Sequence, residues 1–191
     1  MCLITYGKVR DVLNFDRITN AWESNPDGAG IIYKSGGKIY ARKMFSKFSL
    51  LHKALKELHH NQNVAVHLRL ATHGAINKEN CHPFPIPNGF MMHNGILLGL
   101  GKAGKAGYSD SKHLSEILSQ LKQSDRIALL STLQGKFLTW DNNGVELFGH
   151  WETYGGLHVS NKNFIPYDRE FYPAKANYLD FSARGREYWQ D

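Results

Sequence analysis

Apolar and polar positions alternate over several short segments of the chain, and this period of two predicts β-strands. The clearest case is segment 64–71, in which valine and leucine occupy every second position. Further strands are predicted at 3–6, 29–33, 38–43, 136–140, 145–149 and 157–160, with a strand pair broken at Asn94-Gly95 over 90–98. Glycine pairs and Asn-Gly steps between these segments favour tight turns and therefore antiparallel pairing.

Apolar residues that recur at steps of three and four predict the helices. The predicted helices span 46–60, about 110–121, and 125–133. Ser46 can cap the first helix, and Ser109 or Asp110 can cap the second. Strands, then helices, then strands again predict an α+β fold with mainly antiparallel sheets.

Composition predicts one packed globular domain. The chain has 191 residues, of which 42% are hydrophobic and 12% aromatic. We expect one domain over 2–191, with the best-supported core at 2–161 and an irregular, aromatic-rich tail at 162–191. No apolar run approaches the ~18 residues needed to span a membrane, and no leader pattern is recognisable. Two cysteines are too few for a disulfide framework, so we expect a cytoplasmic protein without membrane contact.

The formal charge of +6 and the isoelectric point near 9.3 raise the question of nucleic-acid binding. The basic residues are scattered, and no run of five or more occurs. A solvated basic surface is therefore favoured, and nucleic-acid binding stays an alternative.

Two patterns suggest cofactor or metal sites, but their context argues against both. Segment 99–104 matches GxGxxG, yet the next helix begins only near Asp110 and no βαβ unit surrounds the motif. The ten histidines show no metal-ligand spacing with carboxylates or cysteine pairs. We expect neither a metal nor a cofactor.

Cys2 follows the initiator methionine directly. Removal of Met1 would expose a residue that carries both a thiol, with a pKa near ~8.5, and an α-amine, with a pKa near ~7.7 to 8.0. Such a residue holds a nucleophile and a base together. Taken alone, a cysteine at position 2 is more often an ordinary small apolar residue at the start of a strand.

Several short segments change the interpretation of Cys2. They are Asp27-Gly28-Ala29-Gly30-Ile31, Arg69-Leu70-Ala71-Thr72-His73-Gly74, Asn80-Cys81-His82-Pro83, His93-Asn94-Gly95-Ile96 and Ser109-Asp110-Ser111. In this order behind a penultimate cysteine, they resemble the class II glutamine amidotransferases, whose glutaminase domain is an N-terminal-nucleophile hydrolase. The resemblance is specific from residue 2 to about 110 and looser over 136–161.

The resemblance implies a four-layer αββα sandwich in which Cys2 attacks the glutamine side-chain amide. It also implies that the Asn94 side chain and the Gly95 backbone N–H form the oxyanion hole. Such donors stabilise the charge of a tetrahedral intermediate, and one of them typically lowers the barrier by ~3 to 4 kcal/mol.

The resemblance implies the substrate-binding residues as well. A zwitterionic substrate needs a cation for its carboxylate and an anion for its ammonium group. Arg69 is expected to bind the α-carboxylate and Asp110 the α-ammonium group. Thr72, His73 and Gly74 are expected to form the neighbouring substrate loop.

Each of these residues also has a structural interpretation. Asn94-Gly95 is a favoured hairpin turn, Asp110 can be a helix N-cap, and Arg69 can be the solvent-facing member of an alternating strand. His82 and His93 are predicted to be structural hydrogen-bonding residues and not catalytic bases.

The resemblance has two departures. Leu3 stands where the family usually has glycine, and the chain shows no acceptor domain after the glutaminase segments. We therefore expect a stand-alone glutaminase whose ammonia is used by a separate acceptor protein, or simple amide hydrolysis. The alternatives are a hydrolase of another γ-glutamyl amide, or a non-catalytic protein- or nucleic-acid-binding module on the same fold.

Overall fold

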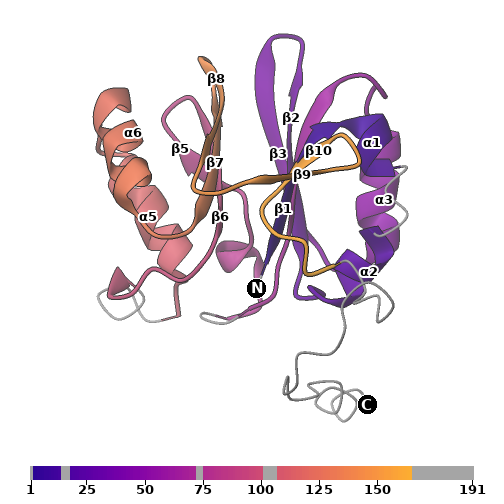
Figure 1. Ribbon diagram of the computed structural model, residues 1–191, viewed down its shortest axis with the longest axis horizontal. Coiled ribbons are helices and arrows are strands. Elements are labelled where there is room, and N and C mark those ends of the chain that lie inside the picture. The colour runs from indigo at the N-terminus through magenta and orange to yellow at the C-terminus, as the bar shows by residue number, and fades with distance from the viewer. Residues whose placement is uncertain (1, 14–17, 72–74, 101–106, 165–191) are drawn as a thin grey trace, which may run out of the picture.

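Two antiparallel sheets lie face to face, and helices cover the outer face of each sheet (Figure 1). The computed structural model describes residues 2–13, 18–71, 75–100 and 107–164. The layers follow the order helix, sheet, sheet, helix, which confirms the predicted four-layer α+β sandwich.

The described residues form ten strands in these two sheets. The larger sheet has the order β3-β2-β4-β1-β10-β9 and contains β1 (Leu3–Lys8), β2 (Ala29–Ser35), β3 (Lys38–Phe45), β4 (Asn63–Leu68), β9 (Glu152–Tyr154) and β10 (Leu157–Val159). The smaller sheet has the order β5-β6-β7-β8 and contains β5 (Phe84–Ile86), β6 (Gly89–Asn94), β7 (Lys136–Asp141) and β8 (Gly144–Phe148). Because β1 pairs with β4 on one side and β10 on the other, the start of the chain is held inside the larger sheet.

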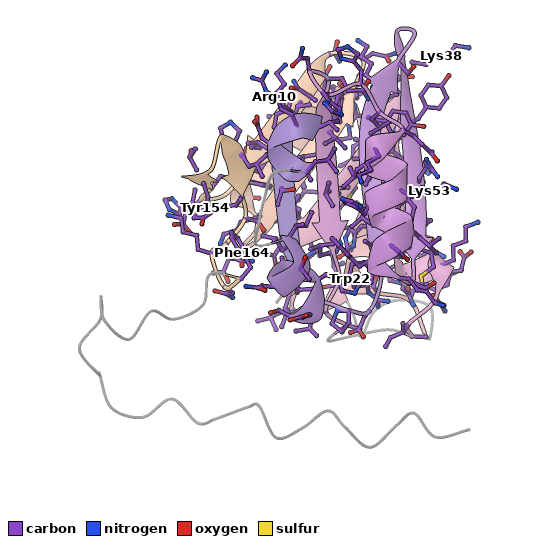
Figure 2. The ribbon with its side chains drawn as sticks, turned by 90° about the vertical axis from the view of Figure 1, so that its right-hand side faces the viewer. Arg10, Trp22, Lys38, Lys53, Tyr154 and Phe164 are labelled. Atoms are coloured by element: carbon purple, nitrogen blue, oxygen red, sulfur yellow. The ribbon has the colours of Figure 1, made fainter. Side chains whose placement is uncertain are left out.

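Helices from two parts of the chain form the outer layers. The larger sheet is covered by α1 (Val9–Leu13), α2 (Ile18–Glu23) and α3 (Phe48–Lys56), which face the viewer in Figure 2. The smaller sheet is covered by α5 (Asp110–Leu118) and α6 (Gln123–Thr132). A short 3-10 helix, η1 (Lys78–Asn80), precedes β5.

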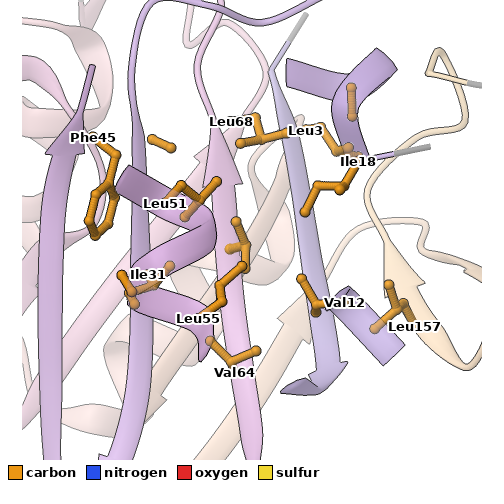
Figure 3. Close-up of a cluster of buried hydrophobic side chains, with 14 of the residues drawn as sticks. Leu3, Val12, Ile18, Ile31, Phe45, Leu51, Leu55, Val64, Leu68 and Leu157 are labelled. Atoms are coloured by element: carbon orange, nitrogen blue, oxygen red, sulfur yellow. The ribbon is translucent and has the colours of Figure 1, made fainter. Parts of the chain in front are cut away.

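The two faces of strand β4 contact different layers, which explains the alternation in its sequence. Val64, Val66 and Leu68 pack in the core beneath the helices, part of which Figure 3 shows. Ala65 and His67 face the smaller sheet. Burial of each large aliphatic side chain contributes about 1.5 to 3 kcal/mol, so a shift of this strand by one residue would be costly.

Some local predictions are confirmed and others are wrong. The predicted third helix and the hairpin of β7 and β8 are present. Helix α3 has Lys47 as its N-cap without a side-chain cap, so the predicted capping by Ser46 is wrong. Strand β6 ends at Asn94 and residues 96–98 form no strand. Elements α1, α2, β5 and β9 were not predicted, because three to six residues are too few to show a period.

Candidate active site

A small cavity lies where the start of β1, the ends of β4 and β6, and the first turn of α5 meet. Cys2, Arg69, Gly95 and Asp110 all line it, so residues far apart in the sequence come together. The cavity has a volume of about 30 Å³, which is less than a glutamine molecule occupies.

The backbone of the larger sheet positions Cys2. Its thiol accepts a hydrogen bond from the backbone N–H of Leu70 at 3.4 Å and lies 3.5 Å from the Leu70 carbonyl oxygen. The carbonyl oxygen of Cys2 accepts a hydrogen bond from Nδ2 of Asn161 at 2.7 Å. Both the side chain and the main chain of Cys2 are thus held in place.

Burial raises the pKa of the Cys2 thiol, while its hydrogen bond with Leu70 and the positive charge of Arg69 act in the opposite direction. The thiol is therefore mainly protonated at neutral pH, and attack on a substrate needs a base that accepts its proton. Met1, whose removal would make the nitrogen of Cys2 that base, lies outside the described residues.

Arg69 follows the last residue of β4 and is only 3% exposed, so the solvent-facing interpretation is wrong. Its backbone N–H donates to the Gly28 carbonyl at 2.8 Å, and its carbonyl accepts from Asp27 N–H at 3.0 Å. The guanidinium Nη1 donates to the Ala75 carbonyl at 3.2 Å. These contacts fix a buried cation at the cavity wall.

Asp110 is the first residue of α5, and the helix is capped by Ser109, whose Oγ accepts from Lys112 N–H at 3.2 Å. The interpretation of Asp110 as N-cap is therefore wrong. Its Oδ2 accepts from Leu97 N–H at 2.8 Å, and its Oδ1 accepts from Ser111 N–H at 2.7 Å. These bonds orient a buried carboxylate, and the helix N-terminus favours its negative charge.

Asn94 and Gly95 end β6 and turn the chain out of the sheet. Strand β6 pairs with β5 and β7, so a hairpin turn at Asn94-Gly95 is excluded. A Cβ at Gly95 would lie 2.8 Å from Nε2 of His93 and 3.1 Å from Cα of Gly135, so only glycine fits without displacement of its neighbours. Nδ2 of the buried Asn94 donates to Oγ of Ser160 at 2.9 Å.

Sequence reasoning missed Ser160 and Asn161, which follow β10. Ser160 exchanges two hydrogen bonds with the backbone of Ile4, and each is 2.9 Å long. Asn161 binds the carbonyl oxygen of Cys2. No local pattern could reveal these roles, because each contact joins residues more than 150 positions apart.

Three buried histidines lie at the cavity, and two of them, His82 and His93, line it. The rings of His67 and His82 stack with centroids 3.9 Å apart, and Nδ1 of His93 lies 2.9 Å from Oγ of Ser111. A Cβ at Gly30 would overlap the carbonyl oxygen of His82, so glycine allows this close approach. Burial lowers the pKa of His67 to about 3, that of His93 to about 4, and that of His82 well below its usual value. Such neutral rings are weak bases at pH 7.

Asn80 is a third residue to which sequence reasoning gave no role. Its Nδ2 donates to the carbonyls of Ala75 at 3.1 Å and Gly107 at 2.7 Å, and its Oδ1 accepts from Ser109 N–H at 2.8 Å. It joins the segment after β4 to the start of α5. Its place in the asparagine-x-histidine-proline segment was the signal that could have found it.

Leu3 packs with Leu68 under the helices (Figure 3) and is not among the residues that line the cavity. Thr72, His73 and Gly74 lie outside the described residues.

The described residues contain no group of three or more histidine, cysteine, aspartate or glutamate side chains placed to hold a metal ion. None of their helices combines the length and the apolar character that crossing a membrane requires.

Comparisons with known proteins identify similar chains. No family model matches this sequence. Glutamine–fructose-6-phosphate aminotransferase (isomerizing) of Caulobacter vibrioides is 31% identical over 101 residues, which are 50% of this chain and 17% of that protein. The glutamine phosphoribosylpyrophosphate amidotransferase of B. subtilis, solved with ADP and GMP, has a TM-score of 0.56 at 20% identity over 83% of this chain and 41% of that chain. A solved allosteric regulatory enzyme of purine biosynthesis has a TM-score of 0.54 at 17% identity, with the same coverage.

The four-layer sandwich places Cys2 directly before a central strand and beside a cavity. The matches agree with the motifs: the chain resembles the class II glutamine amidotransferases and shares the fold of the two solved enzymes. The chain spans about a sixth of the length of the curated relative and less than half of each solved chain.

Proposed function

We propose that the protein hydrolyses the side-chain amide of glutamine to glutamate and ammonia, with Cys2 as the nucleophile. The observation that carries this proposal is the common cavity of Cys2, Arg69 and Asp110. A thiol, a buried cation and a buried carboxylate are the three groups needed to hold an amino acid by its head and attack its side chain.

Substrate recognition depends on two charges. Arg69 binds the α-carboxylate with its planar guanidinium group, and Asp110 accepts hydrogen bonds from the α-ammonium group. Both side chains are buried, so each gains a strong partner when the zwitterion displaces water. Thr72, His73 and Gly74 complete the binding loop in this proposal.

Catalysis begins after removal of Met1. The α-amine of Cys2 accepts the thiol proton, and the thiolate forms a bond to the amide carbon. The C–N bond of the tetrahedral intermediate breaks, and the departing nitrogen takes the proton back from the α-ammonium group of Cys2. Ammonia then leaves. Water then attacks the γ-glutamyl thioester, with the α-amine as base, and releases glutamate and the thiol.

The oxyanion is stabilised by two donors, Nδ2 of Asn94 and the backbone N–H of Gly95. Gly95 lines the cavity, and Asn94 is the residue before it at the end of β6. The backbone N–H of Gly95 needs no side-chain rearrangement, whereas Nδ2 of Asn94 must first leave Oγ of Ser160.

The intact mass of the purified protein, before and after treatment with a diazo-ketone analogue of glutamine, tests this proposal. We expect loss of Met1 and a single adduct, which Cys2→Ala abolishes. Cys81→Ala is the matched control, because Cys81 is the chain's other cysteine and has no proposed role. A protein without Met1 that stays unlabelled, and that turns over no glutamine, would overturn the assignment.

Two further assays separate the remaining alternatives. Arg69 and Asp110 contact only the amino-acid head, so γ-glutamyl amines should be compared with glutamine as substrates.

We further propose that an ammonia-acceptor enzyme is the partner of this activity. The name of the Caulobacter relative describes such a coupled amination. Salt-sensitive DNA binding without any amide hydrolysis would instead support the binding-module alternative.

A further inference from the structure

A second cleft, separate from the catalytic cavity, lies between the edges of the two sheets. Its volume is about 590 Å³, which is within the range of sites for small molecules. Strand β3, the edge of the larger sheet, forms one wall, while β5, β6 and η1 contribute to the other. The two cavities share no lining residue.

The cleft carries positive charge without a lining carboxylate. Arg42, Lys43 and Lys78 line it, and the guanidinium of Arg42 pairs with Glu57 at 2.8 Å. Within the described residues, neither Lys43 nor Lys78 forms an ion pair. Two ammonium groups at this cleft are therefore available to an anion.

Lys43 is the better-positioned of the two. Its Nζ lies 5.2 Å from the centroid of the Phe84 ring, so an aromatic face fixes one side of the ammonium group. Burial lowers the pKa of Lys43, and the positive charges of Lys112 and Lys78 act in the same direction, while Cys81 and Glu79 act against them. An anion in the cleft would relieve both effects.

The rest of the cleft is apolar. Pro83, Pro85 and Phe90 line it, and proline rings offer no backbone donor. Flat apolar groups of this kind suit the planar or apolar part of a ligand, whereas an inorganic ion would leave them unused.

We propose that this cleft binds a small organic phosphate, with its phosphate group on Lys43 and Lys78 and its apolar part against Phe90 and the two prolines. A phosphate monoester carries a charge of about −1.5 to −2 at pH 7, which matches two ammonium groups. A carboxylate would balance only one of them.

Isothermal titration at constant ionic strength, with AMP as the probe, tests the site. We expect AMP to bind, and both inorganic phosphate and adenosine to bind at least about tenfold more weakly, which is about 1.4 kcal/mol for each missing part. Lys43→Met should weaken AMP binding by about tenfold or more, since it keeps the side-chain stem and removes the charge. Lys78→Gln should have an effect in the same direction.

Lys38→Met is the matched control, because Lys38 is exposed at the opposite end of the same strand (Figure 2). It should bind AMP as the wild type does. Thermal unfolding of each free variant shows that the fold is intact. Cys2→Ala should also bind AMP normally, so failure of the proposed glutaminase activity would leave this test unaffected.

Several outcomes would overturn the assignment. The first is the absence of a heat of binding with AMP at millimolar concentration. The second is an equal loss of AMP affinity in Lys43→Met and Lys38→Met. The third is an equal affinity of the wild type for inorganic phosphate and AMP. Binding of a single-stranded oligonucleotide with none of AMP would also contradict a small-molecule site.

Discussion

The side chains of Asn94 and Ser160 meet between the two sheets, where Nδ2 of Asn94 donates to Oγ of Ser160 at 2.9 Å. The same hydroxyl oxygen accepts the backbone N–H of Ile4, and Oδ1 of Asn94 has no partner within the described residues. Rotation of the carboxamide by 180° would let the Ser160 hydroxyl donate to Oδ1. Nδ2 would then be free to bind an oxyanion.

This contact predicts that Ser160 positions the proposed oxyanion hole. Ser160→Ala should lower kcat by about tenfold or more, with little change in KM. The loss of kcat should stay smaller than the ~100- to 1,000-fold loss that follows removal of an oxyanion donor. It should also lower the free energy of unfolding by about 1 to 3 kcal/mol, because the Ile4 N–H loses its acceptor. Steady-state kinetics and urea unfolding measure the two effects.

A double-mutant cycle with Asn94→Ala separates positioning from general destabilisation. If Ser160 acts through Asn94, adding Ser160→Ala to Asn94→Ala should change kcat by much less than Ser160→Ala does in the wild type. Additive losses in kcat would contradict this role.

Ser160 also illustrates the limit of what the sequence predicts. The alternation over β4 and the steps of three and four over α5 are local, so the strands and main helices could be predicted. Ser160 bonds Ile4 only because β10 pairs with β1, and such a long-range pairing leaves no local pattern. The short helices α1 and α2 escaped prediction because packing on the sheet, and not an internal period, stabilises them.

Arg69 and Asp110 illustrate the opposite case. Their local context favoured a strand face and a helix cap, yet both are buried at the cavity. Both residues belong to the ordered motifs, and buried charges are rare unless a partner or a function requires them.

Arg69→Lys should raise the KM for glutamine by about ten- to a hundredfold, with kcat changed by much less. Lysine keeps the charge but loses the planar fork, and hydrogen bonds to charged groups contribute about 1.5 to 3 kcal/mol. Arg10→Lys is the matched control, since Arg10 is exposed on α1 (Figure 2). An unchanged KM in Arg69→Lys would exclude carboxylate binding by this side chain.

The raised pKa of Cys2 predicts its reactivity. In a Cys81→Ala background, the pH dependence of alkylation by iodoacetamide should give a higher pKa for folded Cys2 than for the same residue in concentrated urea. Since the folded thiol holds its proton more tightly, the free energy of unfolding should fall as pH rises above the unfolded pKa, near ~8.5. A lower pKa in the folded state would contradict the dominance of burial.

The buried histidines predict sensitivity to acid. Their folded pKa values lie below the unfolded value of ~6.5, at about 3 for His67 and about 4 for His93, so the unfolded state takes up protons first as pH falls. The stability contributed by each neutral ring is present above pH ~6.5. It declines below this pH by up to about 1.4 kcal/mol per pH unit for each histidine, until the folded pKa is reached.

His82→Phe isolates one of these contributions. Phenylalanine keeps a flat ring between His67 and Phe84, and both nitrogens of His82 lack hydrogen-bond partners within the described residues, so the substitution removes a titrating group without breaking a bond. Urea unfolding at pH 5 and pH 7 should show a smaller loss of stability for His82→Phe than for the wild type. His150→Gln, at an exposed position, should leave the difference between the two pH values unchanged. An equal loss in the wild type and His82→Phe would mean that His82 is already protonated in the folded protein at pH 5.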